Sequence, residues 1–344
     1  MKTLVLYILK FTGIFYLCRR LMANKTLILA YHGFEILDET QFDDQLFIKP
    51  VTLKRRLDYL KKHCNVIPLS QLVEANEAQA KQKNKIAITI DDGWYSTLTV
   101  AAPMLKHYEA PYTVYLTTEN VLDNQPIFHV ALRLILELNI GKQLQYKHSE
   151  EFALDVMISL ASIATIMADI VTIKHQKNDT HLLFEVAKAL EFDFASHVKH
   201  KTLTLMSPAQ VKAIKALGAD IQLHTHTHNT PLDSFSEFAE EINVNKAHII
   251  DMVGQAPEHH CYPSGVYNQD SLVYLRQLGV KTATTCYAGF CTPETERLEL
   301  PRFLDGENIS QIVFEAEVSG VLEVFRQLRK FKFSAARGQK VQAG

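Results

Sequence analysis

The stretch from Lys85 to Trp94 reads Lys-Ile-Ala-Ile-Thr-Ile-Asp-Asp-Gly-Trp. Its short, largely apolar run ends on two acids and a glycine, which is typical of a buried parallel strand. The carboxyl end of such a strand would carry Asp91 and Asp92 into a pocket. Neighbouring side chains on an extended backbone point in opposite directions, so we expect different tasks for the two carboxylates. Taken alone, the pair could equally form an Asp-Asp-Gly turn.

The composition is that of an ordinary globular protein. The chain has 344 residues, of which 47% are hydrophobic and 22% are charged, and its formal net charge is -2. This length can bury a large core in one barrel or two domains, and no block of lysine and arginine indicates nucleic-acid binding. The five cysteines form no Cys-x-x-Cys pair, so we expect neither a disulfide framework nor a thiolate zinc site.

The N-terminal segment carries the one signal for location. Residues 3–17 are almost wholly apolar, interrupted by Lys10 and followed by Arg19 and Arg20. The run is shorter than the roughly 20 apolar residues that span a bilayer, and no small-x-small cleavage motif follows it. We expect an interfacial amphipathic helix that contacts a membrane peripherally through residues 3–20. A signal anchor and a helix packed on the domain are the alternatives. The predicted location is cytoplasmic or peripheral to the cytoplasmic membrane, rather than secreted.

Strand and helix patterns alternate on both sides of the Asp-Asp-Gly stretch, which predicts a parallel α/β fold. Strand patterns lie at 26–31, 85–90, 112–116, 220–223 and 280–285, and helix patterns at 52–62, 96–108, 235–252 and 271–278. The expected parts are an N-terminal apolar or amphipathic helix at 1–24, a barrel domain at 25–320, and a C-terminal helix and tail at 321–344.

Between about residues 123 and 205 this alternation stops. Helical spacing dominates at 131–138, 152–173 and 181–190, without a strand pattern between them. We expect a helical insertion that covers one side of the barrel as a lid or a substrate wall. Its histidines, His129 among them, are expected to be solvated or core residues.

A second decisive stretch, Leu-His-Thr-His-Thr-His at residues 223–228, follows another buried strand. His224 and His228 lie four residues apart, which on a helical turn places both rings on one face. Two imidazoles and one carboxylate form an open site for Zn²⁺ or a similar ion. One residue of the Asp91–Asp92 pair would supply this carboxylate, and the other would take a proton from the attacking water. The residues predict metal-assisted amide hydrolysis.

The ordered set of motifs resembles the polysaccharide deacetylase family, which has the NodB homology domain. The motifs are Ile90-Asp91-Asp92-Gly93, His224-Thr225-x-x-His228 and Tyr262-Pro263-x-Gly265, supported by Ala30-Tyr31-His32 and Leu300-Pro301-Arg302. The likeness covers residues 26–302 apart from the insertion. It implies a distorted (β/α)7 barrel, similar to a TIM barrel. It also implies a divalent metal, zinc first with nickel or cobalt as alternatives, and removal of acetyl groups from N-acetylated sugars.

Carried over residue by residue, the resemblance makes Asp91 the general base. The implied metal ligands are Asp92, His224 and His228. Tyr262 lies in the turn whose backbone N–H is expected to help hold the oxyanion. Trp94 and Tyr95, beside the acids, could stack on a sugar ring, although one of them would rather pack on the barrel.

Two positions depart from the family pattern. Many members carry an arginine two residues before the proline of the Tyr-Pro turn, where this chain has Cys261. Arg302 could replace it in space and orient the catalytic acid, which we state as a hypothesis. The family also usually ends with a Leu-x-x-His segment whose histidine protonates the leaving amine. This chain has no histidine after Gly306.

The general acid must then come from elsewhere, and His32 is the candidate. It follows a strand, and some members that act on poly-N-acetylglucosamine resemble this chain in carrying an acid near the N-terminus. The alternative is that His32 only forms hydrogen bonds in the barrel mouth.

We therefore expect a metal-dependent N-deacetylase of a surface or exported polysaccharide, or of its lipid-linked precursor. One alternative keeps the mechanism and changes the substrate to a formamido sugar or another small amide. The other is a glycan-binding relative that has lost turnover. Asp91 beside a complete set of metal ligands favours an enzyme, because a binding module needs no base there.

Overall fold

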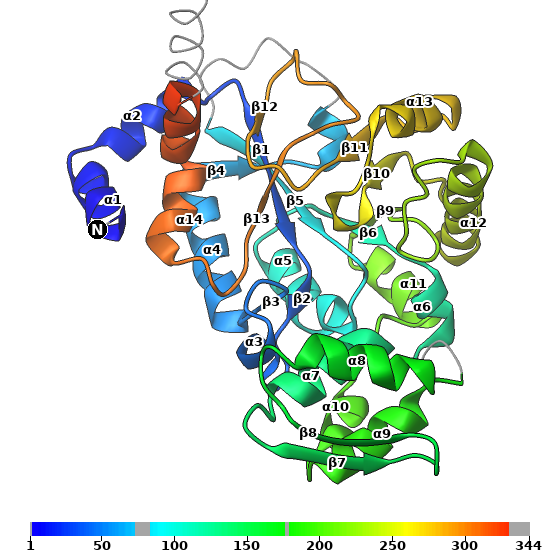
Figure 1. The fold of residues 1–344 in the computed structure, drawn as a ribbon. Helices are drawn as coiled ribbons and strands as arrows, with labels where there is room; N and C mark the ends of the chain where they lie inside the picture. The colour runs from blue at the N-terminus through cyan, green and yellow to red at the C-terminus, as the bar shows by residue number, and fades with distance from the viewer. Residues whose placement is uncertain (1, 73–82, 176–178, 330–344) are drawn as a thin grey trace, which may run out of the picture.

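A curled, mainly parallel sheet lies at the centre of the computed structural model (Figure 1). The structure describes residues 2–72, 83–175 and 179–329. Within these residues nine strands form the sheet, and its continuous path is β11-β10-β9-β6-β5-β1-β12. β4 pairs with β5 and β13 with β1, and of the described pairings in this sheet only β1–β12 is antiparallel. The expected distorted barrel of strands and helices is confirmed.

The strands of this sheet are short, and β1 and β5 are buried along almost their whole length because helices and loops cover both faces. They are β1 (Thr26–Tyr31), β4 (Cys64–Val66), β5 (Asn84–Ile90), β6 (Tyr112–Leu116), β9 (Asp220–Leu223), β10 (His259–Cys261), β11 (Thr282–Thr284), β12 (Phe290–Cys291) and β13 (Arg302–Leu304). Two further strands, β2 (Gly33–Phe34) and β3 (Phe47–Ile48), pair with each other beside it.

Helices surround the sheet with their apolar faces turned inward (Figure 1). The longer ones are α4 (Pro50–His63), α11 (Pro208–Ala216), α12 (Phe235–Val253), α13 (Gln269–Gln277) and α14 (Gln311–Val318). Shorter pieces are α3 (Glu39–Phe42), α5 (Ala102–His107) after a π-helical turn (Thr97–Ala101), α6 (Glu119–Asp123), and 3-10 turns at Leu69–Leu72 and Pro263–Gly265. Capping boxes at Ser207 and Asn268 set where α11 and α13 begin.

The strand register brings the predicted motifs to one edge of the sheet. Tyr31 pairs with Ile90, and Leu116 of the neighbouring β6 pairs with Leu223. Leu223 in turn pairs with His260. Because these parallel strands end together, the residues that follow them gather at one end of the barrel.

The insertion is not wholly helical, which corrects the expectation from the sequence. It contains α7 (Phe128–Glu137), α8 (Ile163–Thr172), α9 (Thr180–Ala189) and α10 (Phe194–His200), and an antiparallel hairpin of β7 (Gln143–Lys147) and β8 (Ala153–Met157). The sequence of β7 alternates polar and apolar residues, and its burial alternates in step. That alternation is the strand signal which the helical interpretation missed.

The N-terminal segment forms two short helices, α1 (Lys2–Phe11) and α2 (Ile14–Leu21), separated at Gly13. They pack on α14 through Leu6, Phe15 and Cys18. No helix in the described parts of the chain is both long enough and apolar enough to cross a bilayer. Residues 321–329 are helical, and the rest of the predicted C-terminal part lies outside the described residues.

A buried ion pair joins α4 to the segment after β13. Arg56 Nε lies 3.0 Å from Asp305 Oδ2, and both side chains are almost inaccessible to solvent. The hydroxyl of Tyr31 donates a hydrogen bond to the same oxygen at 3.0 Å. The Arg56 guanidinium also lies over the ring of Phe314, 4.5 Å from its centroid. One cluster therefore connects β1, α4 and α14.

We predict that Arg56→Met lowers the free energy of unfolding by about 3–5 kcal/mol, because Asp305 would keep a buried charge without its partner. Lys54→Met on the same helix is the matched control, since Lys54 forms an exposed pair with Asp58 and should leave stability nearly unchanged. Urea unfolding followed by circular dichroism measures both. Equal midpoints for the two variants would contradict the prediction.

Candidate active site

Asp91 and Asp92 follow β5 directly, and their carboxylates meet different partners. Both oxygens of Asp91 accept hydrogen bonds from Arg302, at 2.7 Å from Nη1 and 2.8 Å from Nη2. Asp92 Oδ1 instead faces His224 Nε2 at 3.2 Å and His228 Nε2 at 3.3 Å. The two carboxylates thus point to different partners, as expected for adjacent residues at the end of a strand.

The Asp92–His224–His228 group has the donor geometry of a metal site. Ligands about 2.0–2.1 Å from a tetrahedral zinc ion lie about 3.3 Å apart, which matches the two distances above. Asp92 Oδ1 is buried and has no hydrogen-bond partner in the structure. His224 Nδ1 lies 2.8 Å from the carbonyl oxygen of Cys261, which can only accept, so this nitrogen carries the proton.

A positive charge between these three side chains would stabilise them. With Nδ1 protonated, a neutral His224 ring presents the lone pair of Nε2 to the Asp92 carboxylate. Either a proton on each ring or one metal ion would relieve this contact. The ion satisfies both rings and the carboxylate at once, so the residues fit the group that the sequence predicted.

The loops at this edge hold unusual backbone conformations. In the loops that follow β5 and β9, three residues other than glycine have positive φ: Asp92 at 71°, Thr225 at 61° and His228 at 62°. His224 and His228 therefore converge through a left-handed loop after β9, and the expected helical turn is absent at these described residues. Such conformations are costly and are found mostly at functional sites. Gly93, at φ 94°, has no room for a side chain, because a Cβ would lie 2.3 Å from Leu116 Cδ1.

Trp94 does not line the site, which corrects the prediction that it stacks on a sugar. Its side chain is only 2% exposed and packs edge-on against Phe47, with ring centroids 5.5 Å apart. Its Nε1 donates a hydrogen bond to Asp92 Oδ2 at 2.9 Å. Trp94 is therefore a core residue that holds the Asp92 carboxylate in position through this hydrogen bond. Tyr95 is half-buried, and its ring lies 5.7 Å from Lys201 Nζ.

Tyr262 also differs from its predicted role. Its ring stacks on Tyr267 with centroids 4.6 Å apart, and its hydroxyl donates to the Leu298 carbonyl at 3.1 Å. Its backbone N–H donates to the Thr284 carbonyl oxygen at 3.3 Å. In this conformation neither group is directed to a substrate oxyanion, because both hold β10 to its neighbouring segments.

Arg302 lies where the hypothesis placed it, against Asp91. It comes from β13 and is 1% exposed. Its Nη2 also donates to Cys261 Sγ at 3.1 Å, so Cys261 occupies the position of the family arginine and contacts the guanidinium that replaces it. Burial raises the pKa of the Cys261 thiol well above its usual value, which keeps it neutral beside Asp91.

The electrostatics of the site keep Asp91 ionised. Burial acts to raise the pKa of its carboxyl, and the Arg302 guanidinium, followed by His32, lowers it to below its ordinary value. His32 Nε2 lies 3.7 Å from Asp91 Oδ2, too far for a hydrogen bond, and its side chain is 22% exposed. The ring therefore lies beside Asp91 and is partly open to solvent.

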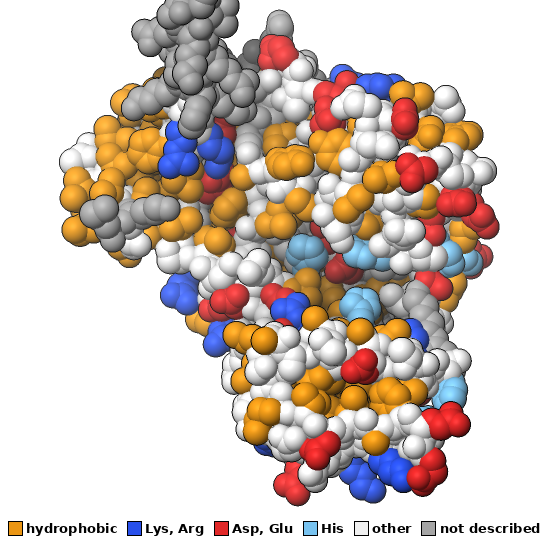
Figure 2. All heavy atoms as spheres, in the orientation of Figure 1, with side chains coloured by type: hydrophobic (Ala, Val, Ile, Leu, Met, Phe, Trp, Pro, Cys, Tyr) orange, Lys and Arg blue, Asp and Glu red, His pale blue; other side chains and the backbone are white. Residues whose placement is uncertain are grey.

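One histidine of the insertion, His129 on α7, also faces this region, although the sequence analysis placed it outside the site. Partial removal of its ring from solvent lowers its pKa first, and the charge of His228 lowers it further. Figure 2 shows histidine and acidic side chains in the hollow between the barrel and the insertion. The sequence has no local signal for this position of His129, which only the folded structure shows.

We predict that Arg302→Ala reduces amide hydrolysis on the order of 100-fold, because the base loses its orienting partner. Removal of the guanidinium also leaves burial to raise the pKa of Asp91. The acidic limb of the kcat/KM profile should therefore move to higher pH. Arg302→Lys keeps the charge and should shift that limb less. An unchanged rate and limb in Arg302→Ala, in protein shown to be folded, would refute the assignment.

Comparison with known proteins identifies the family. The family model for polysaccharide deacetylases matches residues 78–146 and 173–283, which is more than half of the chain. A search of curated proteins found no match.

Solved structures of low sequence identity share the fold. The Streptococcus pyogenes deacetylase PplD in complex with acetate is 17% identical, with a TM-score of 0.56 over 86% of this chain and 98% of that chain. The de-N-acetylase from Aggregatibacter actinomycetemcomitans is 14% identical, with a TM-score of 0.54 over 85% and 99%. IcaB from Ammonifex degensii is 15% identical, with a TM-score of 0.53 over 86% and 97%. At these identities the likeness shows the fold, and the match to the family model shows the membership. The chain belongs to the polysaccharide deacetylase family, and it is a carbohydrate deacetylase.

Proposed function

We propose that this protein is a metal-dependent N-deacetylase of N-acetylated sugars in a surface or exported polysaccharide, or in its lipid-linked precursor. The observation that carries the proposal is the separation of two buried acids at one strand end. Asp92 converges with His224 and His228, while Asp91 is held apart by Arg302. A base beside a metal-ligand set is the arrangement that amide hydrolysis by water requires.

Asp92, His224 and His228 would hold the ion, and zinc is the metal we propose, with nickel or cobalt as alternatives. When bound, the ion would polarise the amide carbonyl and lower the pKa of water. The mixed set of two imidazoles and one carboxylate suits these metals better than magnesium or calcium, which prefer oxygen ligands alone.

Asp91 and His32 would move the two protons of the reaction. Water adds to the carbonyl carbon, and Asp91, ionised at neutral pH, accepts the proton that the water loses. The carbon–nitrogen bond then breaks, and His32 donates a proton to the leaving amine. Arg302 does not touch the substrate in this scheme, and it holds the Asp91 carboxylate in one orientation. His32 lies on the open side of Asp91, which supports this division of tasks.

The same contacts favour an enzyme over a glycan-binding relative without turnover. The absent family arginine and the absent C-terminal histidine were the reasons for considering such a relative, and Arg302 supplies a guanidinium on Asp91. For location we propose the cytoplasm or the cytoplasmic membrane. The five cysteines are all free thiols, which supports a reducing environment.

We predict about one divalent ion per chain, removable by a chelator. Asp92→Asn and His228→Gln should each lose it, because each removes one of three ligands. His226→Gln is the matched control, since His226 lies two residues from each ligand histidine and contacts Thr118 and His248 instead. Metal content measured by mass spectrometry after dialysis tests this. Retention of the ion in both ligand variants would place it elsewhere.

We predict zinc-dependent release of acetate from N-acetylglucosamine oligomers, lost in Asp91→Asn. The loss should be on the order of 100-fold to 10,000-fold, the usual contribution of a general base. His32→Gln should lose a similar factor in kcat. Acetate quantified enzymatically, with zinc and with chelator, gives the rates.

Three outcomes would change the proposal. Full turnover in both His32→Gln and His32→Ala would remove His32 as the acid. A metal-loaded protein that releases no acetate would have a different amide as its substrate. A protein without metal and without activity would be the glycan-binding relative.

A further inference from the structure

α1 and α2 leave a large apolar surface uncovered. One face of the two helices packs on α14. On the other, Leu4, Ile8, Phe11, Leu17 and Leu21 are between 54% and 86% exposed. A third of all large hydrophobic side chains that are exposed in the described chain lie in these two helices. Figure 2 shows them gathered on the side of the molecule where Figure 1 places α1 and α2. Contiguous apolar patches of this kind mark interaction surfaces.

The apolar surface continues past α1. A groove of about 510 Å³ lies between α1 and residues 321–329, with Val5, Val313, Leu322 and Phe325 in its walls. Phe325 is 41% exposed, and Leu328 on the same helical segment is 53% exposed. The uncovered face thus extends over two parts of the chain that are far apart in sequence.

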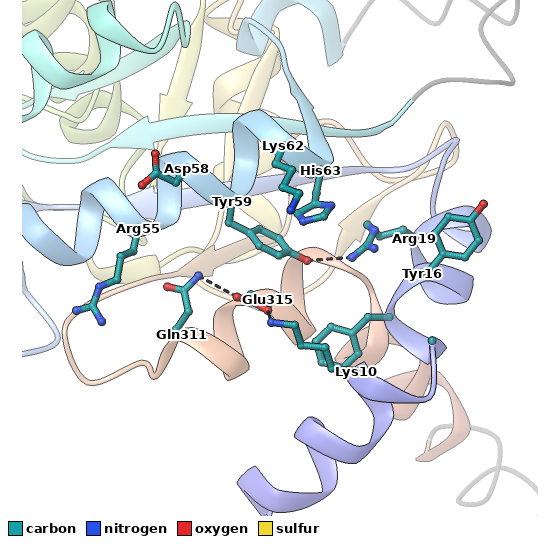
Figure 3. Close-up of a pocket in the computed structure, with 12 residues that line it drawn as sticks. Lys10, Tyr16, Arg19, Arg55, Asp58, Tyr59, Lys62, His63, Gln311 and Glu315 are labelled. Carbon is teal, nitrogen blue, oxygen red and sulfur yellow. Dashed lines mark hydrogen bonds and ion pairs between the residues drawn. The ribbon is translucent and has the colours of Figure 1, made fainter.

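Beside this surface lies a basic cavity of about 610 Å³ between α2 and α4 (Figure 3). Lys10, Arg19, Arg55 and Lys62 line it, with two acids, Asp58 and Glu315. In Figure 3, Arg19 from α2 and Lys62 from α4 extend toward the same side of Tyr59, while Arg55 lies at the far end.

The two acids of the cavity are already paired, so its remaining charge is positive. Glu315 forms an ion pair with Lys10, and Asp58 pairs with Lys54 at 2.9 Å. Arg19 donates to the neutral hydroxyl of Tyr59 at 3.0 Å. Among the described residues neither Arg19 nor Lys62 forms an ion pair.

The ring of His63 lies in the electrostatic field of the same cationic side chains. Burial lowers the pKa of its ring, and the charges of Arg19 and Lys62 lower it further. An anion in the cavity would offset the repulsion between Arg19 and Lys62. The cavity therefore has the chemistry of a phosphate-binding site, and it lies next to an apolar surface.

We propose that α1 and α2 lie on a membrane surface, and that the cavity between α2 and α4 takes the phosphate headgroup of an anionic phospholipid. The acyl chains would meet the exposed leucine, isoleucine and phenylalanine side chains, while Arg19 and Lys62 contact the phosphate. Apolar residues bordered by cations are what an interfacial helix needs on an anionic bilayer. Tyr7 and Tyr16, 45% and 57% exposed, add rings that suit the boundary between headgroups and acyl chains.

Co-sedimentation of the full chain with vesicles tests the proposal. The protein should sediment with vesicles of equimolar phosphatidylcholine and phosphatidylglycerol, and far less with phosphatidylcholine alone. Equal binding to both vesicles would overturn a headgroup role for the cavity. No binding to either would overturn the membrane contact itself. Neither readout depends on deacetylase activity, so failure here is distinct from failure of the proposed function.

The charge variant is the double substitution Arg19→Gln and Lys62→Gln. A cation near an anionic surface contributes about 1 kcal/mol, so the partition coefficient should fall on the order of 30-fold. Arg276→Gln with Lys281→Gln makes the same change of net charge at exposed positions paired with Glu296 and Glu258. If both doubles weakened binding equally, net charge would explain the result and the cavity assignment would be wrong.

The apolar variant is the double substitution Ile8→Ser and Phe11→Ser. It should abolish sedimentation without changing the melting temperature, since both side chains are exposed. Leu160→Ser with Val171→Ser removes two exposed apolar side chains from the insertion and should bind vesicles as the wild type does. Unchanged binding of the first double would overturn the contact through α1.

Other occupants predict different results. If the full chain did not bind vesicles and protein truncated after Arg329 did, the segment after Arg329 would be the occupant of the apolar face. If the wild type were a dimer and Ile8→Ser with Phe11→Ser a monomer, neither binding vesicles, a second copy would be the occupant. If glycerol 3-phosphate raised the melting temperature through Arg19 and Lys62 while vesicles did not bind, the cavity would serve a soluble phosphate. Each of these outcomes would overturn the proposal.

Discussion

The ion pair between Arg302 and Asp91 is the interaction on which the rest of the site depends. Both side chains are almost fully buried, and the guanidinium binds both carboxylate oxygens. Without this partner, burial would raise the pKa of the acid and favour its protonated form. Arg302 lies on β13 and Asp91 follows β5, and these two strands flank β1, so the ion pair also joins two strands across the one between them. The order of the strands therefore influences the charge of the Asp91 carboxylate, because it places Arg302 beside it.

Asp92, His224 and His228, the proposed metal ligands, depend on the same strand ends, but through strained loops. Left-handed conformations at Asp92, Thr225 and His228 each cost about 1–3 kcal/mol. The packed structure can maintain these conformations because two hydrogen bonds fix the side chains. Trp94 donates to the Asp92 carboxylate, and His224 donates to the Cys261 carbonyl oxygen. At the site, the strain lies in the loops that bring the three side chains together, and the strands before these loops remain regular.

The parts of the chain around the barrel were the hardest to predict. The β7–β8 hairpin was hidden because the flanking segments have helical spacing, and its own alternation covers only a few residues. His129 approaches the site because α7 folds back over the barrel, which no local pattern encodes. Trp94 was assigned to the substrate because it lies next to the acids, and Tyr262 because the resemblance places it in the turn expected to hold the oxyanion. In the fold both turn inward, because an apolar ring is more stable in the core than in an open cleft.

The sequence by itself determined the parallel barrel and the set of residues that meet at its open end. Continuous apolar runs specify buried strands, and parallel strands end at one edge, so the residues that follow Tyr31, Ile90 and Leu223 had to gather there. The residues alone left open which acid turns to the histidines and which to Arg302; the family resemblance implied the answer, and the tertiary structure shows how it is reached. That choice depends on the positive φ of Asp92 and on a strand more than 200 residues away in sequence. Neither can be read from local spacing, because both are held by packing.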